Sequence, residues 1–351
     1  MIERAFWRDR RVLLTGHTGF KGAWLALWLE NLGAKVFGLA LPPDTEPALF
    51  ALLQPMTGLT SRLADIRDPD AVAAAVAEAR PSVVIHMAAQ ALVRRSYRLP
   101  VETLCTNVMG TAYLLDSLRG AEGLDAVLVV TTDKVYRHDG KPHPFSENDP
   151  LGGADPYSAS KAAAELLVAS MAASFFAAKG VAMATARAGN VIGGGDWSED
   201  RLIPDLWRAV RAGEPLQLRN PNATRPWQHV LEPLCGYLQY VERLARGADV
   251  PSALNFGPLA RDVLTVGQVA DTMLVSMGSS QRWIKVGGPQ PAEAQFLSID
   301  PSLAMSSLGW RPRLSASDAL QWTADWYRAV SDGVGARPAA LEQIRRYEAL
   351  S

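Results

Sequence analysis

A tyrosine and a lysine, Tyr157 and Lys161, stand four residues apart in a segment whose composition predicts the start of a helix. At this spacing the two side chains share one helix face. A neighbouring ammonium group favours the phenolate and lowers a tyrosine pKa from its ordinary value of about 10. The pair therefore predicts a tyrosine that takes a proton from a substrate, although exposed helices also carry such pairs by chance.

Three glycines, Gly16, Gly19 and Gly22, lie in the segment 16–22 (GHTGFKG), between an apolar run and a predicted helix. Glycines in such a turn let the backbone approach a pyrophosphate at a helix N-terminus. The alternative is a tight turn between strand and helix that binds nothing. Because the turn follows the first strand of an alternating pattern, we expect it to bind a dinucleotide cofactor.

A third polar group, Thr132, Asp133 and Lys134, follows the apolar run 126–131. Open α/β sheets bind their ligands at the carboxyl ends of their strands. The alternative is a surface turn in which Asp133 and Lys134 form an ion pair. The place of the group in the predicted sheet favours a ligand site.

The elements that position these groups alternate along the chain. Apolar runs with strand character cover residues 11–15, 35–40, 82–86, 126–131 and 181–187, and helical patterns cover residues 23–30, 70–79, 105–118 and 162–178. Strands that alternate with helices predict the α/β class, with a Rossmann-type, doubly wound parallel sheet. The short run 254–256 is expected to add one last strand.

The alternation stops after residue 193, where glycine and proline become frequent. A chain of 351 residues is also long for a single core. We therefore expect a cofactor-binding domain of residues 1–190 plus about 225–257. The remainder, about 191–224 plus 258–351, is expected to form a smaller, mixed α/β C-terminal lobe that binds the substrate.

Composition and charge exclude several classes of protein. With 48% hydrophobic and 20% charged residues, the chain is typical of a globular protein. Lys and Arg total 35 against 36 Asp and Glu, so the basic excess that favours nucleic acid is absent. The five histidines and the cysteines Cys105 and Cys235 show no metal-ligand spacing, so no metal is expected.

The sequence also carries an expectation about location. Residues 1–11 are charged and lack the apolar region of a secretory signal. The most apolar stretch, 162–178, contains Glu165 and falls short of the roughly 20 residues that a bilayer span needs, so we expect a buried helix and no membrane partner. Two cysteines cannot form a disulfide scaffold, and the cytoplasm is the expected compartment.

Taken together, the glycine turn and the Tyr157–Lys161 pair resemble the extended short-chain dehydrogenase/reductase family over nearly the whole chain. The resemblance implies that Tyr157 is the catalytic base and Lys161 its partner. Nucleotide-sugar 4,6-dehydratases of this family have Thr-Asp-Glu where this chain has Thr132, Asp133 and Lys134. The lysine in place of glutamate resembles the CDP-glucose 4,6-dehydratase branch.

Further segments resemble the same branch, namely 86–93 (HMAAQALV), 187–197 (RAGNVIGGGDW) and 225–233 (RPWQHVLEP). The resemblance implies a set of residues around the cofactor, which are Gly16, Gly19, Phe20, Lys21, Gly22, Asp65, Ile66, Ala88, Ala89, Gln90, Thr106, Tyr157 and Lys161. It implies a second set around the nucleotide sugar, which are Asn190, Arg201, Arg225 and Asn255. Independently of the family, the planar guanidinium of Arg225 suits a diphosphate or else a structural ion pair.

The choice between NAD and NADP is open from the residues alone. The end of the second predicted strand, 39–43 (LALPP), offers no carboxylate for the adenosine ribose, and Asp44 lies slightly late for that role. By resemblance we expect NAD.

The implied reaction is an internal oxidation, elimination and reduction on a nucleotide-linked hexose, here CDP-glucose, giving a 4-keto-6-deoxy sugar and water. Thr132 would polarise the sugar 4-hydroxyl, Tyr157 would take its proton, and Asp133 would protonate the departing 6-hydroxyl. Lys134 has two open roles: a neutral base at C5, if burial and Lys161 lower its pKa, or a cation that stabilises the enolate.

Other readings remain open at this point. The chain is alternatively a dehydratase or epimerase for another nucleotide sugar, or a non-catalytic protein that senses NAD. Members of the family commonly dimerise through two helices, so a homodimer is expected through helices 162–178 and 111–118. His86 is expected to pack at a strand end, whereas His17, inside the glycine turn, either touches the pyrophosphate or faces solvent.

Overall fold

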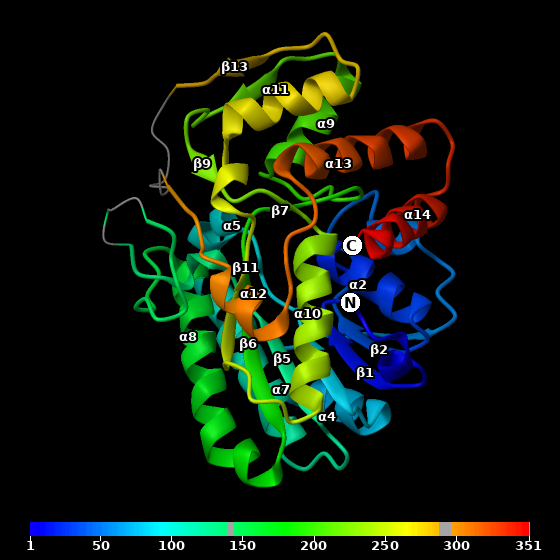
Figure 1. Cartoon of the computed structure of the whole chain (residues 1–351), viewed down its shortest axis with the longest axis vertical. Coiled ribbons are helices and arrows are strands. Elements are labelled where there is room, and N and C mark those ends of the chain that lie inside the picture. The colour runs from blue at the N-terminus through cyan, green and yellow to red at the C-terminus, as the bar shows by residue number, and fades with distance from the viewer. Residues whose placement is uncertain (139, 141–142, 288–295, 351) are drawn as a thin grey trace.

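The computed structural model describes residues 1–138, 140, 143–287 and 296–350. Its core is a sheet of seven parallel strands in the order β11-β6-β5-β4-β1-β2-β3 (Figure 1). The strands are β1 (Arg11–Thr15), β2 (Lys35–Ala40), β3 (Leu59–Leu63), β4 (Val83–His86), β5 (Ala126–Val130), β6 (Ala182–Ala188) and β11 (Ala253–Phe256). The predicted doubly wound parallel sheet is confirmed.

The order of the strands places the ligand crevice. In the sheet, β2 and β3 lie on one side of β1, and β4, β5, β6 and β11 lie on the other side. The switch between β1 and β4 opens a crevice at the carboxyl ends of the strands. All residues of β4 and β5 are buried, which is why these strands are continuous apolar runs in the sequence.

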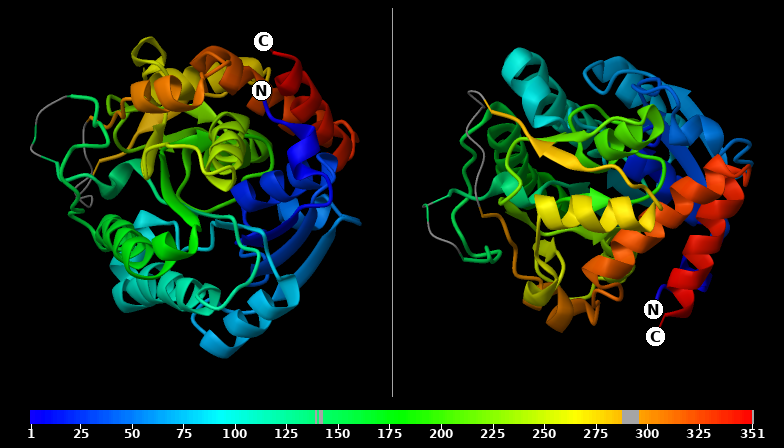
Figure 2. Two further views of the ribbon diagram at one scale, coloured as in Figure 1. Left: turned by 60° about the horizontal axis from the view of Figure 1, so that its bottom comes forward. Right: turned by 90° about the horizontal axis from the view of Figure 1, so that it is seen from above.

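Helices cover both faces of the sheet, as the left view of Figure 2 shows. On one face lie α2 (Phe20–Asn31) and α10 (Leu231–Ala245), and on the other α4 (Pro69–Ala79), α7 (Gly110–Leu118) and α8 (Pro156–Met171). Shorter helices in this half are α1 (Arg4–Trp7), α3 (Leu49–Leu52), α5 (Val93–Arg98), α6 (Pro100–Leu104), the π-helix Cys105–Met109 and the 3-10 turn Asp133–Val135.

The sequence patterns missed one strand of the main sheet, β3. Its residues are partly or fully exposed, and three of the five are Thr60, Ser61 and Arg62. A strand at the edge of a sheet that faces solvent lacks the apolar run by which the inner strands were recognised. Pairing with β2, from Val36 with Leu59 to Ala40 with Leu63, makes this segment a strand.

The second half of the chain carries three small two-stranded sheets and further helices above the main sheet (Figure 1). The strand pairs are β7 (Val191–Ile192) with β10 (Gln228–His229), β8 (Leu216–Leu218) with β13 (Trp283–Lys285), and β9 (Thr224–Arg225) with β12 (Leu264–Thr265). The helices are α9 (Leu202–Ala212), α11 (Val266–Ser276), α12 (Ser302–Leu308), α13 (Ala316–Ser331) and α14 (Ala336–Ala349), with a 3-10 turn at Ala260–Asp262.

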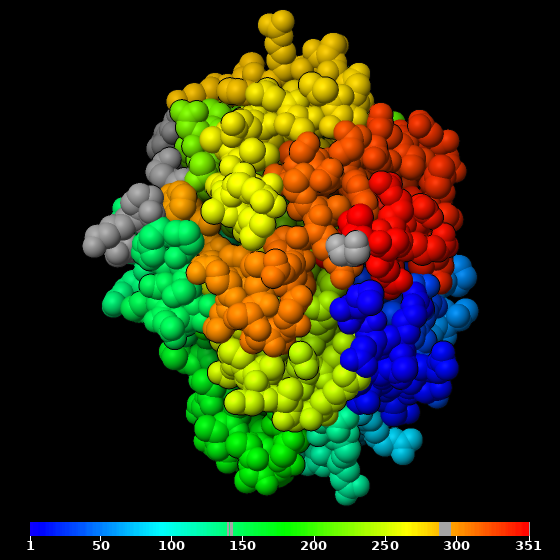
Figure 3. Space-filling view, in the orientation of Figure 1, coloured from blue at the N-terminus to red at the C-terminus, as the bar shows by residue number. Residues whose placement is uncertain are grey.

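Two of these late helices pack against the first half of the chain. α12 contacts β11 and α10, and α14 contacts α2 and α3. In the space-filling view the C-terminal residues, in red, lie directly against the N-terminal ones, in blue (Figure 3). Arg4 and Glu348 form an ion pair of 2.8 Å across this contact. The division into two domains stays a prediction, because the end of the chain belongs to this packing.

α8 is longer than the sequence pattern predicts. The π-helix Ala172–Phe176 and the 3-10 turn Ala177–Lys179 extend it to a helical segment of 24 residues, Pro156–Lys179. By length and composition this segment is able to cross a membrane, so the prediction that it is too short was wrong. Only a third of its most apolar window is buried, because one side packs on β6 and α7 while the other side is exposed.

His86 ends β4 and closes the floor of the crevice, as expected. The amides of Met87 and Ala88 donate to Thr15 Oγ1, at 3.0 Å each, so this hydroxyl donates in turn to His86 Nδ1 at 2.6 Å. His86 Nε2 lies 2.9 Å from Thr111 Oγ1, which donates to the carbonyl of Asn107. This chain of donors assigns His86 the neutral Nε2–H tautomer. Burial, assisted by Lys161, lowers its pKa to about 3.

We expect His86 to make the protein sensitive to acid. The unfolded chain binds a proton at this residue below pH ~6.5, whereas the folded chain does not bind it until about pH 3, so stability is lost as the pH falls. Between pH 7 and pH 5 the loss from this residue is about 2 kcal/mol of unfolding free energy. Urea unfolding of the protein and of His86→Gln at both pH values measures it. Equal pH dependence of the two proteins would contradict this account.

Candidate active site

A cavity of about 1890 Å³ lies over the carboxyl ends of the strands, between the main sheet and the second half of the chain. The structure brings nearly all of the predicted residues to its wall. Those that line it are Gly16, Gly19, Phe20, Lys21, Gly22, Asp65, Ile66, Ala88, Ala89, Gln90, Thr106, Thr132, Asp133, Lys134, Tyr157, Lys161, Asn190, Arg201 and Arg225.

The glycine turn is a close-packed cradle at the start of α2. Gly16 has φ of +77°, and a Cβ on it would lie 2.7 Å from the amide nitrogen of Ala88. A Cβ on Gly22 would lie 2.0 Å from the carbonyl oxygen of Gly16. No side chain caps the helix at Gly19, so the amides of its first turn face the cavity without a capping partner. This geometry fits a pyrophosphate at the positive end of the helix.

His17 does neither of the two things that the sequence left open. It is fully buried, with Nε2 2.7 Å from Ser61 Oγ and its ring edge-on to Phe50 at 5.1 Å. Gly38 gives it room, since a Cβ there would lie 2.5 Å from the imidazole. Burial lowers the pKa of His17 to about 4, so the residue packs as a neutral ring behind the turn. Both expectations were wrong because β2 and β3 cover this side of the turn.

Tyr157 and Lys161 stand on the first turns of α8. Pro156 begins the helix, and the Asp155 carboxylate caps it by accepting from the amide of Ser158 at 2.9 Å. Lys161 Nζ donates to the carbonyl of Val130 at 3.1 Å, which anchors the amine at the end of β5. The helix and the sheet thus hold both side chains at the cavity.

The charge states of this pair differ from the simple expectation. Burial raises the pKa of Tyr157 to about 12, and a hydrogen bond with Thr132 only partly opposes this. Burial also lowers the pKa of Lys161 to about 8, although Glu165 favours the ammonium form. The predicted lowering of the tyrosine pKa was therefore wrong for this structure, because removal from water outweighs the neighbouring charges.

Asp133 is fully buried between β5 and β6. Its Oδ1 accepts from Thr132 Oγ1 at 3.0 Å and lies 3.4 Å from Lys134 Nζ. Its Oδ2 is buried without a hydrogen-bond partner among the described residues. This oxygen packs against Gly189, where a Cβ would lie only 1.7 Å away. Sequence reasoning missed Gly189, whose importance follows from its position directly after β6.

Lys134 is less buried than a neutral amine would require. Its side chain is 29% exposed, and its ammonium pairs with Asp133. The burial on which the neutral-base role depended is therefore incomplete. The surface-turn reading of this segment fails as well, because Thr132 and Asp133 are both buried in the cavity wall.

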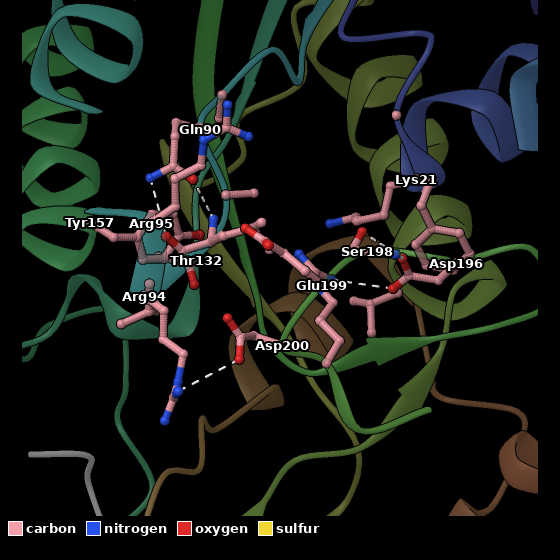
Figure 4. A pocket seen from close by; sticks show the side chains of 18 of the residues that line it. Lys21, Gln90, Arg94, Arg95, Thr132, Tyr157, Asp196, Ser198, Glu199 and Asp200 are labelled. Atoms are coloured by element: carbon pink, nitrogen blue, oxygen red, sulfur yellow. Dashed lines mark hydrogen bonds and ion pairs between the residues drawn. The ribbon is translucent and has the colours of Figure 1, made fainter. Parts of the chain in front are cut away.

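Lys21 extends from α2 into the same cavity, from a different wall than Tyr157 and Thr132 (Figure 4). Its Nζ donates to the hydroxyl of Tyr237 at 3.1 Å. Burial and the neighbouring cations Lys161 and Arg201 lower its pKa to about 7, while Asp133 acts in the opposite direction. Lys21 and Lys161 therefore share the cavity wall with the buried carboxylates of Asp133 and Asp196.

Three of the four residues expected around the nucleotide sugar reach the cavity. Arg225 is 9% exposed and donates to the carbonyl of Thr224, and Arg201 lies 3.6 Å from Asp196. Asn190 lines the wall with φ of +41°.

Asn255 is the exception and corrects the prediction. It is fully buried and does not line the cavity. Its Oδ1 accepts from the Tyr136 hydroxyl at 2.6 Å, and its Nδ2 donates to the carbonyl of Phe145 at 2.9 Å. These contacts use the side chain to join β11 to the segment that follows β5.

Ion pairs that the sequence did not indicate cross the mouth of the cavity. Asp200 pairs with Arg94 of α5 at 3.6 Å (Figure 4) and with Arg219 at 3.0 Å. Beside them Arg98 pairs with Glu199 at 2.9 Å. The partners lie about 20 to 100 residues apart in the chain, so no local pattern reveals them.

Asp44, the carboxylate that the sequence places slightly late for the adenosine ribose, lines the cavity near its surface. It follows β2, is 70% exposed on its side chain, and pairs with Arg95 at 2.6 Å. Near it, Asp65 pairs with Arg67 at 2.6 Å, which lowers the pKa of the Asp65 carboxyl.

Comparison with known proteins agrees with this site. The chain matches the GDP-mannose 4,6 dehydratase family over residues 13–323. It is 44% identical to the CDP-glucose 4,6-dehydratase of Salmonella typhimurium, covering 99% of this chain and 98% of the relative. Its fold is similar to the UDP-glucose 4-epimerases of Thermotoga maritima (TM-score 0.78, 21% identity) and Thermus thermophilus (TM-score 0.75, 24% identity). Each alignment covers 91% of this chain and 99% of the epimerase.

Proposed function

The chain belongs to the GDP-mannose 4,6 dehydratase family, and we propose that it converts CDP-glucose to CDP-4-keto-6-deoxyglucose and water with NAD as its cofactor. The observation that carries this proposal is the convergence of Thr132, Asp133, Lys134 and Tyr157 on one cavity. The relative that shares 44% of its residues over the whole length supports the cytidine nucleotide.

The cofactor would lie along the glycine cradle and the ends of β1 and β4. The residues that we assign to it are those of the cavity wall from Gly16 to Gly22, together with Asp65, Ile66, Ala88, Ala89, Gln90, Thr106, Tyr157 and Lys161. When bound, NAD would supply a hydride acceptor for the oxidation at C4 and a hydride donor for the reduction at C6, and its positive charge would favour the Tyr157 phenolate. Tighter binding of NADP than of NAD in a titration would overturn this assignment.

Tyr157 would act first, by taking the proton of the sugar 4-hydroxyl as C4 is oxidised. Thr132 is its hydrogen-bond partner and would share the same hydroxyl. Lys161 would stabilise the developing phenolate with its ammonium. The cavity wall holds all three groups at the end of β5.

Asp133 would serve the elimination that follows. The 4-ketone acidifies the C5 hydrogen, and a base would remove that proton while the C6–O bond breaks. The same base would return the proton to C5 when hydride reaches C6. A protonated Asp133 would give its proton to the departing hydroxyl, which leaves as water. Asp133 lines the cavity, and its Oδ1 accepts from Thr132 Oγ1 at 3.0 Å.

Lys134 is placed to act beside Asp133, and its replacement separates the two halves of the reaction. In Lys134→Met we expect C4 oxidation to proceed and the elimination to stall, because neither a C5 base nor an enolate-stabilising cation remains. Reduced nicotinamide absorbance should then persist on the enzyme. Full turnover by the variant would remove Lys134 from the mechanism.

The nucleotide sugar would lie toward the second half of the chain. We assign its contacts to Asn190, Arg201 and Arg225, since two guanidinium groups at this wall suit a diphosphate. Asn255 has no part in this assignment, because its amide is used inside the fold.

The deciding experiment is mass spectrometry of products after the protein and NAD are incubated with CDP-, dTDP-, UDP- and GDP-hexoses. Loss of one water from CDP-glucose alone is the expected result. Water loss from another nucleotide sugar would keep the mechanism and replace the substrate. An unchanged mass throughout would contradict the proposal in favour of an epimerase or a non-catalytic NAD sensor.

We also expect a homodimer that works in the cytoplasm. Large apolar side chains are exposed along α6, α8 and the π-helices next to them, and these are Val101, Leu104, Met109, Leu166 and Phe175. Such a row of side chains on two neighbouring helices is typical of a protein interface. Light scattering should give twice the chain mass, and Leu166→Arg should shift it toward the monomer. A monomeric mass for the unmodified protein would refute the dimer.

Both cysteines are free, which supports a reducing compartment.

A further inference from the structure

The buried amine of Lys161 has an opposite charge near it, the carboxylate of Glu165 on the same helix. Its amine is buried and lies among cationic and titratable groups from several elements, with Lys21 on α2 and His86 on β4. β5 contributes only a backbone carbonyl, that of Val130. Glu165, one helical turn further along α8, is the group that favours the ammonium form. Without a nearby carboxylate this buried amine would readily lose its proton.

Glu165 does not line the cavity, and it accepts four hydrogen bonds from three residues. Its Oε1 accepts from Thr131 Oγ1 at 2.5 Å and from Arg187 Nε at 2.9 Å. Its Oε2 accepts from Thr185 Oγ1 at 2.7 Å and from Arg187 Nη2 at 2.9 Å. Glu165 and Arg187 have only 4% and 5% of their side chains exposed. A carboxylate that accepts four hydrogen bonds is fixed in position.

The same carboxylate also reaches the turn that carries the reactive groups. Thr131, which donates to Glu165, directly precedes Thr132 and Asp133 in the chain. The backbone amide of Thr131 donates to the carbonyl of Ala186 on β6 at 2.8 Å. Glu165 thus connects α8, β6 and the end of β5 at a point just behind the cavity.

We infer that Glu165 is a positioning residue for the reaction: from behind the cavity it supplies the counter-charge of Lys161, one turn away on α8, and holds the Thr131–Asp133 turn in place. The inference rests on the proposed function, because a charged Lys161 matters only if Tyr157 must lose a proton. Glu165 touches neither substrate nor cofactor in this arrangement. It acts through Lys161 and Thr131.

The charge of Lys161 can be followed without any turnover. In the ligand-free protein, the rate at which acetic anhydride labels Lys161 measures the neutral amine, with exposed Lys35 as the internal reference. Peptide mass spectrometry across a range of pH should give a midpoint near 8 for the unmodified protein. In Glu165→Gln the midpoint should fall by about one pH unit or more, since an opposite charge has been removed. At pH 7 this corresponds to labelling that is about fivefold faster.

Two companion variants separate charge from structure. Glu165→Asp keeps the charge and should restore the midpoint. Glu242→Gln is the matched control, because Glu242 is also a buried carboxylate, bound by Trp7 Nε1 at 2.7 Å and the amide of Glu3 at 2.9 Å, on the remote helix α10. It should leave the labelling of Lys161 unchanged. If Glu165→Gln alone does not fold, the double variant with Arg187→Met removes the orphaned cation and should show the same lowered midpoint.

Turnover of CDP-glucose supplies the second readout. The alkaline limb of the pH profile for Glu165→Gln should move to lower pH together with the labelling midpoint, and Glu165→Asp should move it back. A folded Glu165→Gln protein with an unchanged midpoint and profile overturns the inference, even if its activity is lower. An unmodified protein that removes water from no nucleotide hexose instead overturns the proposed function, whatever the labelling shows.

Discussion

Tyr157→Phe is expected to lower the turnover of CDP-glucose by about 10³-fold, within the range that a general base commonly contributes. The substitution removes one hydroxyl oxygen from a buried side chain and leaves its ring on α8. The proton of the sugar 4-hydroxyl then has no acceptor, so C4 is not oxidised. Product formation by mass spectrometry and reduced nicotinamide in a single turnover both measure the loss.

Binding distinguishes this explanation from damage to the fold. Affinity for CDP-glucose, measured by calorimetry, should change by less than about threefold, because the contacts that we propose for the diphosphate and nucleotide do not include Tyr157. Tyr113→Phe is a suitable control, since Tyr113 lies on α7 and does not line the cavity. Turnover by Tyr157→Phe within tenfold of the unmodified enzyme would exclude Tyr157 as the base.

Gly189→Ala is expected to lower turnover by about 10²-fold by displacing Asp133. The added methyl group would lie 1.7 Å from Asp133 Oδ2, far inside van der Waals contact. The carboxyl must rotate away from its 3.0 Å hydrogen bond with Thr132, or the end of β6 must move. If Asp133 has the proposed role in the elimination, C4 oxidation should continue while water loss fails. Mass spectrometry should therefore show a 4-keto sugar that retains its 6-hydroxyl.

A double-mutant cycle tests whether the clash with Asp133 is the cause. Gly189→Ala alone should also lower the unfolding free energy by about 1–3 kcal/mol, the usual cost of overpacking. In the background of Asp133→Ala this cost should largely disappear, since the clashing atoms are gone. Gly120→Ala is the matched control, because nothing lies within 4 Å of the methyl group it adds. Normal turnover by Gly189→Ala would show that the acid does not depend on this contact.

Local patterns were sufficient for the sheet and for the polar turns at its edge. The runs 12–14 and 126–130 are apolar throughout because inner parallel strands are covered on both faces. A parallel sheet sends the carboxyl ends of its strands to one edge, so the glycine turn and Thr132–Lys134 had to meet there. The edge strand β3 was missed for the opposite reason, since its exposed face carries no apolar signal.

The sequence by itself placed the glycine turn and the Thr132–Lys134 turn at one edge of the sheet, because strand ends and helix starts are local features. Only the tertiary structure decided what those residues contact. His17 is buried against Ser61, and the side chain of Asn255 is hydrogen-bonded to Tyr136 and Phe145 instead of lining the cavity. Burial raises the pKa of Tyr157 to about 12. Burial and non-local hydrogen bonds cause all three outcomes, and neither is encoded in residue spacing. The support of Lys161 by Glu165 has the same origin, since the partners Thr131 and Thr185 lie 34 and 20 residues from Glu165 in the chain and packing brings them together.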